Sequence, residues 1–523
     1  MRPMQGCSPT RTPLRVLVVA HNLPASVRHI GPVVRELLDR GHEVHMALEP
    51  PARKHADHPW LREASTHERF TWGIVESWRR DPWFLVARWL RRTDDYIRSL
   101  QLGQERVPYF VERAAGRTPA GGRTLVNLPG VSTRRGLRLL SRVLTALDAA
   151  VPTSRGTVAF IRELRADVVV IVPILMPGST DSAYVRAAIA ARVPNVVSVP
   201  SWDNLSSKQL LRVVPDALAV WNETQRHEAE QLHGVPPERI VVTGAQTFDH
   251  WFGWEPRDRA AFCARVGLDP SRPYFLYAGG ALFPGTMTEA EFGRNWVDSL
   301  RAADDPTLRE VGILVRPHPK RMADWSRVPF DDLEGVAVWP REGASFAGGE
   351  ADADYFDSIH HSAGVVGVNT SAMIEAAIIG RPVYTVLVPE FHSSQGGTFH
   401  FEYVLEPSGG FVRTAETLED HQLQLSALLS GESNGGLDAG RRFVESFVRP
   451  FGTDRAATPI FADAIEEVVR VGSTARATDR PWTVALRLLL LPSLARVQLR
   501  RATQKLRLEV RRLAGRTPSA AED

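Results

Sequence analysis

A run of polar residues between a predicted strand and a predicted helix is the strongest candidate for chemistry in this sequence. Asn369, Thr370 and Ser371 follow an apolar stretch at 364–368 and precede a helical pattern. Asn369 or Thr370 is placed to cap that helix, so its first backbone N–H groups and its dipole would face the carboxyl edge of the sheet. Such an arrangement binds anions, and the Thr370 and Ser371 hydroxyls add donors for phosphate oxygens. The run predicts a phosphate site; a simple Thr or Ser cap is the alternative.

Glu375 follows Ser371 by one turn of the same predicted helix. Residues four apart lie on one helical face, so the carboxylate of Glu375 would lie beside the predicted phosphate site. A carboxylate there could accept hydrogen bonds from both hydroxyls of a ribose. A solvated glutamate on an ordinary helix explains the residue equally well.

A second group of polar residues follows the strand predicted at 311–315. Arg316 and His318 alternate with two prolines, and Lys320 and Arg321 come next. The prolines fix φ and prevent a helix, which holds His318 in an extended turn at the carboxyl end of the strand. Doubly wound sheets bind ligands at that edge, where these cations could hydrogen-bond a diphosphate. The alternative is a histidine that only caps a turn.

Two residues are candidates for a catalytic base. Asp203 lies in a polar loop with Trp202 and Asn204, directly after a predicted strand, where it could accept a proton from an alcohol. His29 lies at the start of the first predicted helix, and an imidazole with an ordinary pKa near ~6.5 suits the same task. A loop cap at Asp203 and a surface histidine at position 29 are the alternatives.

The elements that would position these residues alternate between strand and helix in two series. The predicted strands of the first series are 15–20, 43–48, 168–172, 195–199, 217–221 and 240–243, and those of the second are 274–278, 311–315, 335–339, 364–368 and 382–388. Each series predicts a doubly wound parallel sheet. We therefore expect an α/β protein with two Rossmann-like domains, 14–255 and 270–445, followed by a helical region at 446–470.

Taken together, the motifs resemble those of GT-B glycosyltransferases, a superfamily of two facing Rossmann-like domains that includes nucleotide-sugar transferases and CDP-glycerol glycerophosphotransferases. The resemblance covers roughly residues 14–470. Its stretches, in chain order, are 29–32 with 37–44, Val242–Asp249, Arg316–Pro319, Asn369–Glu375 and Phe451–Ala456. By this resemblance the two domains face a cleft, and the helix at 446–470 crosses back to the first domain.

The resemblance also implies roles for the candidate residues. The phosphates of a nucleotide-activated donor would be held by a set comprising Gly280, Arg316, His318, Asn369, Thr370 and Ser371. Glu375 would bind the ribose, and His29 or Asp203 would act as the base. GT-B chemistry needs no bound metal, because cationic side chains and helix N-termini stabilise the leaving nucleoside diphosphate. No cofactor is therefore expected beyond the donor substrate.

Two basic segments depart from the general pattern of this superfamily. Residues 51–150 carry 18 Lys and Arg against 10 Asp and Glu, although the whole chain has a net charge of only +3. This segment contains five tryptophans and predicts a mainly helical insertion that could contact a membrane or an acceptor. Residues 481–516 predict a basic amphipathic tail, whose apolar stripe includes Leu499, Leu506, Val510 and Leu513. Such a helix can lie in the interface of an anionic membrane, or it can pack on its own domain.

Composition limits the remaining alternatives. The chain of 523 residues is 43% hydrophobic and 24% charged, which is ordinary for a globular protein, and its two cysteines exclude a disulfide scaffold. No segment reaches ~18 uninterrupted apolar residues and no secretory cleavage site follows Leu14–Ala20, so we expect a cytoplasmic protein, peripheral on the inner face of the membrane.

We expect transfer of a sugar or polyol phosphate from a nucleotide-activated donor, a nucleotide-sugar or a CDP-polyol, to a lipid-linked or polymeric glycan acceptor in cell-surface glycan synthesis. A nucleotide-sugar 2-epimerase, which uses the same cleft, is the alternative. A non-catalytic glycan-binding or nucleic-acid-binding protein ranks last, because no base-stacking module is present. Nucleic acid is not expected as a partner.

Overall fold

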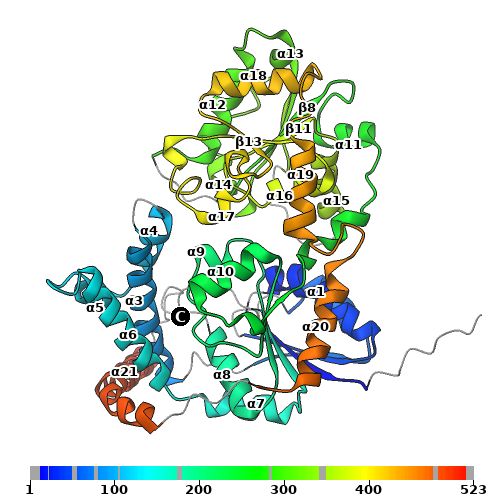
Figure 1. The fold of residues 1–523 in the computed structure, drawn as a ribbon. Helices are drawn as coiled ribbons and strands as arrows, with labels where there is room; N and C mark the ends of the chain where they lie inside the picture. The colour runs from blue at the N-terminus through cyan, green and yellow to red at the C-terminus, as the bar shows by residue number, and fades with distance from the viewer. Residues whose placement is uncertain are drawn as a thin grey trace, which may run out of the picture.

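The computed structural model describes residues 12–21, 23–49, 56–75, 81–103, 107–172, 180–281, 286–340, 349–474 and 481–513, with no account of side chains beyond Thr503. Two parallel β-sheets form two α/β domains, one above the other in Figure 1. The predicted fold class is therefore confirmed.

The N-terminal sheet has seven parallel strands in the order β3-β2-β1-β4-β5-β6-β7. Its central strands are apolar and buried along nearly their whole length, as expected where helices cover both faces of a parallel sheet. The strands are β1 (Arg15–Ala20), β2 (Glu43–Leu48), β3 (Phe70–Ile74), β4 (Val168–Val172), β5 (Asn195–Ser198), β6 (Ala217–Val220) and β7 (Ile240–Val242). The helices of this half are α1 (Leu23–Asp39), α2 (Pro59–Ala64), α3 (Pro82–Leu102), α4 (Pro108–Arg117), α5 (Ala120–Val126), α6 (Arg134–Ala150), α7 (Arg155–Glu163), α8 (Asp181–Ala191), α9 (Asn204–Ser207) and α10 (Glu223–His233).

The C-terminal sheet has six parallel strands in the order β10-β9-β8-β11-β12-β13. The strands are β8 (Tyr274–Ala278), β9 (Gly312–Arg316), β10 (Val336–Val338), β11 (Gly364–Val366), β12 (Val383–Val386) and β13 (Val412–Ala415). The helices are α11 (Arg259–Val266), α12 (Glu289–Arg301), α13 (Pro306–Glu310), α14 (Met322–Trp325), α15 (Glu350–His360), α16 (Ala372–Ile379), α17 (Phe399–Glu402), α18 (Leu418–Leu429) and α19 (Leu437–Phe443). The sheet edge at which strands 8, 9, 11 and 12 end faces the first domain.

The segment predicted as an insertion, 51–150, differs from that prediction at its start. β3 lies within it and pairs with β2 along five residues, so this segment supplies an edge strand of the sheet. From Pro82 to Ala150 most of the described residues lie in helices, and these helices project beside the sheet (Figure 1).

Four of the five tryptophans of this segment pack inward and do not form an exposed aromatic surface. Trp60 is buried against Phe70, while Trp72, Trp83 and Trp89 are partly buried against apolar clusters. The fifth, at position 78, lies outside the described residues.

Helix α20 (Ala457–Val471) returns from the second domain to the first. Phe461 and Ile465 are fully buried in the same apolar cluster as Ile30 and Val34 of α1, so α20 completes the core of the N-terminal domain. The helical region predicted at 446–470 is interrupted: residues 449–456 separate a π-helical turn at Val444–Val448 from α20.

A glycine controls how closely α20 approaches the N-terminal domain. Gly244 has φ +84°, and a Cβ there would lie 2.8 Å from the Cβ of Ala457. We expect Gly244→Ala to destabilise the protein by about 1–3 kcal/mol more than Gly234→Ala, because overpacking adds to the backbone strain. Gly234 is the matched control, since its φ is +65° and a Cβ there would meet nothing within 4 Å. Equal losses in a urea denaturation series would contradict this expectation.

The last helix, α21 (Pro481–Leu513), packs along α3 and α6. Its window Trp482–Leu499 has a mean hydropathy of 1.2 and is long and apolar enough to cross a membrane, by length and composition, with 11% of the window buried. The sequence criterion of about 18 uninterrupted apolar residues did not identify this window, because polar residues interrupt it. The stripe residues Leu506, Val510 and Leu513 and the segment 514–516 lie outside the side chains described.

Candidate functional site

A pocket of about 330 Å³ lies between the two domains. Nearly all of its lining residues follow the carboxyl ends of strands or lie in the loops and short helices beyond them, which is the edge where doubly wound sheets bind ligands. The N-terminal domain and α4 contribute Tyr109, Ser201, Trp202, Asp203, Ser207 and Lys208, and the C-terminal domain contributes Ala281, His318, Asn369, Thr370, Ser371, Ser393, Ser394, Thr398 and His400. The pocket thus brings together Asp203, His318 and the 369–371 run, which are up to 168 positions apart in the chain.

The start of α16 forms one wall of this pocket. Ser371 is the exposed N-cap residue of the helix, and its side chain makes no capping hydrogen bond. The Thr370 hydroxyl accepts a hydrogen bond from the backbone N–H of Ala372 at 3.4 Å, and the Asn369 amide donates to the Ser394 carbonyl. Ser371 therefore presents a hydroxyl to the pocket at the positive end of a helix, where an anion is favoured.

His318 lies beside this helix start. Its Nδ1 accepts a hydrogen bond from the backbone N–H of Lys320 at 3.2 Å. Burial, together with the charges of Lys320 and Arg321, lowers the pKa of His318 to about 4. At neutral pH the ring is therefore uncharged and can donate a hydrogen bond from Nε2 to a phosphate oxygen without carrying a formal charge.

The opposite wall carries an ion pair from the N-terminal domain. Asp203 and Lys208 lie 3.1 Å apart (Oδ1 to Nζ). Burial acts to raise the pKa of Asp203, but the charges of Lys208 and His400 and hydrogen bonds to its carboxylate lower it below its ordinary value. A carboxylate with a low pKa is a weak base and a good hydrogen-bond acceptor, so Asp203 is better suited to orient a hydroxyl than to remove its proton.

Sequence reasoning missed the residues that close the pocket around Asp203. The ring of His400 packs edge-on against Trp202 at 4.8 Å, joining the two domains. Burial lowers the pKa of His400 to about 4. Tyr109 reaches the pocket from α4, whose neighbour Phe110 belongs to a small cluster with Phe399. Nothing in the sequence around Tyr109, including the proline that begins α4, predicted that this side chain would reach the pocket.

Glu375 does not line the pocket. Its carboxylate is buried and binds Arg28 of the N-terminal domain, while Trp251 Nε1 and the hydroxyl of Tyr355 donate hydrogen bonds to it. The predicted ribose site is thus occupied by an ion pair between the domains. A ribose could reach this carboxylate only after Arg28 leaves it.

His29 is also outside the pocket lining. It is buried, its Nε2 lies 2.6 Å from the Ser198 hydroxyl, and Gln246 contacts the same nitrogen at 3.1 Å. Burial lowers the pKa of His29 to about 3, so the ring is neutral at physiological pH.

Two members of the predicted phosphate-binding set have other partners. The guanidinium of Arg316 donates to the Ser358 hydroxyl at 2.9 Å and stacks over Tyr355, so it points toward α15. The backbone N–H of Gly280 donates to the carboxyl group of Glu289 at 2.8 Å. In both cases the donor that was predicted to bind phosphate instead donates a hydrogen bond to another side chain of the C-terminal domain.

A buried cluster at the end of β1 also escaped prediction. His21 lies 2.7 Å from Asp181 (Nε2 to Oδ1) and 3.2 Å from Glu49 (Nδ1 to Oε2). Burial lowers the pKa of His21, but the two carboxylates outweigh it and raise the pKa to about 10. The imidazolium, charged at neutral pH, lies between two carboxylates and links the ends of β1 and β2 to the start of α8.

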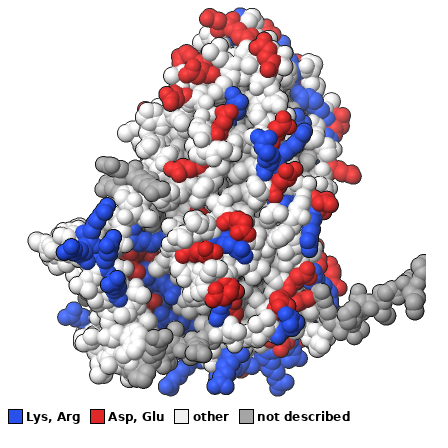
Figure 2. Space-filling view, viewed as in Figure 1, with Lys and Arg blue, Asp and Glu red and all other residues white. Residues whose placement is uncertain are grey.

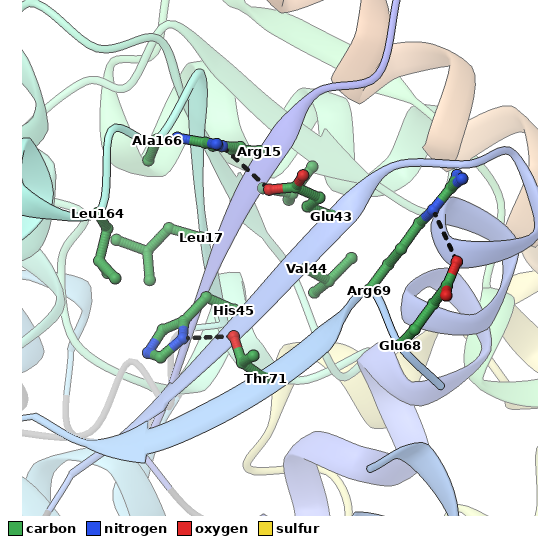
Figure 3. A pocket seen from close by; sticks show the side chains of 11 residues that line it. Arg15, Leu17, Glu43, Val44, His45, Glu68, Arg69, Thr71, Leu164 and Ala166 are labelled. Atoms are coloured by element: carbon green, nitrogen blue, oxygen red, sulfur yellow. Dashed lines mark hydrogen bonds and ion pairs between the residues drawn. The ribbon is translucent and has the colours of Figure 1, made fainter. Parts of the chain in front are cut away.

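A second hollow of about 390 Å³ lies at the opposite, amino end of the N-terminal sheet (Figure 3). Its charged side chains pair with one another: Arg15 with Glu43 at 3.0 Å, and Arg69 with Glu68 at 3.7 Å. His45 contacts Thr71 at 2.9 Å. This hollow is a poor candidate for the functional site, because its charged side chains already form ion pairs and parallel sheets bind ligands at the opposite, carboxyl edge.

Comparisons with known proteins give the architecture. No family model matches the sequence, and no curated protein matches it either. A solved glycosyltransferase from Rickettsia africae ESF-5 is 10% identical, with a TM-score of 0.50 over 88% of this chain and 100% of that one. The chain has a GT-B fold.

Two further solved structures share this fold. A UDP-N-acetylglucosamine 2-epimerase is 12% identical, with a TM-score of 0.50 over 89% of this chain and 98% of that one. S. aureus MnaA, solved with UDP, is 11% identical, with a TM-score of 0.50 over 88% of this chain and 98% of that one. Both kinds of enzyme weighed from the sequence therefore occur on this architecture.

Proposed function

We propose that this protein is an enzyme that binds a nucleotide-activated donor in the interdomain pocket and transfers its sugar, or polyol phosphate, to a lipid-linked or polysaccharide acceptor in cell-surface glycan synthesis. The observation that carries the proposal is the pocket itself, in which the free N-cap hydroxyl of Ser371 and the neutral His318 face Asp203 and Lys208 across the two domains. UDP is the first nucleotide to test, because one solved protein of this fold, S. aureus MnaA, is bound to it.

The chemistry proposed for the pocket follows from its two walls. Thr370, Ser371 and the first turn of α16 would bind the donor phosphates, with His318 donating a further hydrogen bond. Lys208 would stabilise the charge that develops on the leaving nucleotide, a nucleoside diphosphate in sugar transfer or a nucleoside monophosphate in polyol-phosphate transfer. Asp203 would orient the acceptor hydroxyl, whose proton is released to solvent as the new bond forms. Asn369 already lines the pocket, whereas Gly280, Arg316 and Glu375 stay proposed donor contacts, and His29 a proposed base, that need rearrangement to act. That no metal or cofactor takes part stays a prediction.

A nucleotide-sugar 2-epimerase is the second candidate, favoured by the similarity in fold to an epimerase of known structure. The two activities differ in what they require. An epimerase inverts C2 of the sugar without any acceptor, whereas a transferase releases free nucleotide only when an acceptor is present. Incubation with UDP-GlcNAc alone, followed by NMR of the products, separates the two: an epimer formed without acceptor would overturn the transferase proposal.

Ser371→Ala tests the donor site. The hydroxyl is exposed at the helix start, so its removal leaves the fold intact, while loss of one hydrogen bond to a charged phosphate weakens binding by about tenfold. Titration calorimetry with UDP, GDP, CDP, dTDP and CMP first selects the best nucleotide, and the variant is then compared with wild type. Ser430→Ala removes an exposed hydroxyl from the end of α18 and is the matched control. An unchanged affinity in Ser371→Ala would show that phosphate binds elsewhere.

A further inference from the structure

We propose that α21 and the exposed side of α6 together form a membrane-docking surface that lies flat on an anionic lipid bilayer. This inference does not depend on the reaction catalysed, because it rests on side chains outside the interdomain pocket. It concerns α21 from Trp482 to Leu499 and the part of α6 from Arg134 to Val143.

One face of α21 is bound to protein. Leu490 is only 5% exposed and belongs to the apolar cluster formed with α3 and α6, where Leu486 and Val497 are partly buried. Thr483 is fully buried, and Arg487 Nε donates a hydrogen bond to the Ala150 carbonyl at 2.7 Å. These contacts fix the helix along the side of the N-terminal domain.

The other face of α21 is apolar as well, and it faces solvent. Side chains exposed by between 44% and 69% of their surface are Trp482, Val484, Leu488, Leu489, Leu491 and Leu499. A helix on the surface of a soluble protein ordinarily places polar residues on its outer face. Although Ser493, Arg496 and Gln498 are also exposed on α21, this group of exposed tryptophan, valine and leucine side chains indicates a partner that takes up apolar surface.

Helix α6 adds charge beside this apolar face. It packs against α21 and exposes Leu139 and Val143, one turn apart, by 64% and 46%. Four exposed arginines flank them: Arg134, Arg135, Arg138 and Arg142. Its one acidic residue, Asp148, is buried between Arg91 and Arg186. Figure 2 shows that Asp and Glu gather over α13 and α18, at the other end of the molecule.

This combination selects an anionic bilayer as the partner. Leucine and tryptophan side chains enter the boundary of the acyl chains, and each arginine near the surface adds attraction to acidic headgroups. Two copies of this chain meeting through the same face would bring the α6 arginines of both copies together, which opposes self-association.

The buried contacts also decide the orientation of α21. A helix that crossed the bilayer would have to leave α3 and α6, exposing the apolar cluster around Leu490 and placing Arg487 in hydrocarbon. A helix lying in the plane of the membrane keeps those contacts and inserts only its outer leucines. The window Trp482–Leu499 is therefore an interfacial segment and does not span the bilayer.

Vesicle flotation with the full-length protein tests this surface. We expect wild type to float with vesicles of 70% phosphatidylcholine and 30% phosphatidylglycerol, and to bind pure phosphatidylcholine at least tenfold more weakly. The double variant Leu488→Glu/Leu489→Glu should lose at least tenfold in partitioning, because both side chains are two-thirds exposed and contribute little to folding. Leu423→Glu, at a leucine 70% exposed on α18 in the other domain, is the matched control and should bind like wild type.

A second pair of variants tests the charge. Arg138→Glu/Arg142→Glu should weaken binding to the anionic vesicles at least tenfold, while Arg442→Glu, at an exposed arginine of α19, should not. Equal flotation of all variants would overturn the proposal that this surface binds membranes. Binding to neutral vesicles that persists in 0.5 M NaCl and in carbonate would overturn the in-plane orientation of α21.

Analytical ultracentrifugation tests a second copy of the chain as the partner. If wild type dimerises, Leu488→Glu/Leu489→Glu abolishes the dimer and no variant binds vesicles, then a second copy is the partner and a lipid bilayer is not. Thermal denaturation of each variant establishes that it is folded.

Discussion

Replacing Asp249 with alanine is expected to destabilise the protein by about 3–5 kcal/mol, the largest loss we predict for a single substitution. The Asp249 carboxylate accepts hydrogen bonds from Arg449 Nη2 at 2.8 Å and from the backbone N–H and hydroxyl of Thr458, each at 2.7 Å. It also accepts from the backbone N–H of Ala457 at 3.1 Å. The variant would leave a buried guanidinium without its anion and the start of α20 without a cap.

The measurement is urea denaturation of Asp249→Ala beside Asp258→Ala. Asp258 also caps a helix, α11, through one hydrogen bond to the backbone N–H of Ala261 at 2.9 Å, and it is surface-exposed. Its loss should cost about 1 kcal/mol. If the two variants lose the same stability, Asp249 acts as an ordinary cap and does not anchor the return helix.

Asp249 also shows what the sequence could predict and what it could not. The stretches ending at Asp249 and at Ala456 each resemble GT-B segments, and the alternation of strands and helices predicted both sheets. The contact between those stretches depends on side-chain direction in three dimensions, which no local pattern encodes. Two of the four edge strands, β7 and β10, were predicted, and the other two, β3 and β13, were not. β13 has the short, half-polar sequence Val412-Arg-Thr-Ala415, which carries little strand signal of its own, so its place in the sheet depends on its neighbours.

The members of the candidate site were predictable where the position of the backbone alone determines whether a residue lies in the pocket. His318 and Ser371 follow strands of one parallel sheet, whose carboxyl ends share an edge, so their meeting there was predictable. Asp203 follows a strand of the other sheet, and it joins them because the two domains face each other, as the GT-B resemblance implied. Arg316 has a long side chain that turned to Ser358 instead. Glu375 is matched by Arg28, 347 positions away, and that pairing depends on how the two domains close on each other.

A second contact between the domains carries a carboxyl group with a raised pKa. Glu228, on α10 of the N-terminal domain, accepts a hydrogen bond from the hydroxyl of Tyr403 in the C-terminal domain at 2.8 Å. Burial raises the pKa of Glu228 from 4.5 to about 7, and the nearby Asp203 carboxylate adds to the shift. Folding therefore binds a proton at this position between pH 4.5 and 7.

This shift predicts a loss of stability as pH rises, which Glu228→Gln should remove. Below pH 4.5 the Glu228 carboxyl is protonated in both the folded and the unfolded state, so it does not make stability depend on pH. Between pH 4.5 and 7 it is ionised in the unfolded chain but still protonated in the folded state, so the free energy of unfolding falls as pH rises. Above pH 7 it is ionised in both states and the loss is complete. The difference of about 2.5 pKa units corresponds to about 3 kcal/mol. Glutamine keeps the acceptor for Tyr403 and cannot ionise, so the variant should match wild type near pH 4.5 and exceed its stability by about 3 kcal/mol at pH 8.

The comparison between variants isolates Glu228 from every other titrating group, because the rest of the chain is the same. Urea denaturation at half-unit steps from pH 4.5 to 8.5 gives the difference in unfolding free energy between wild type and Glu228→Gln. Glu223→Gln changes a carboxyl 72% exposed on the same helix, and it should alter stability by less than about 0.5 kcal/mol throughout. A constant difference between Glu228→Gln and wild type across this range would mean that Glu228 is already ionised at pH 5, and that its bond with Tyr403 joins the domains with equal strength at every pH. A difference that grows from pH 5 to pH 7 and then levels off would confirm that burial keeps Glu228 protonated in the folded state up to about pH 7.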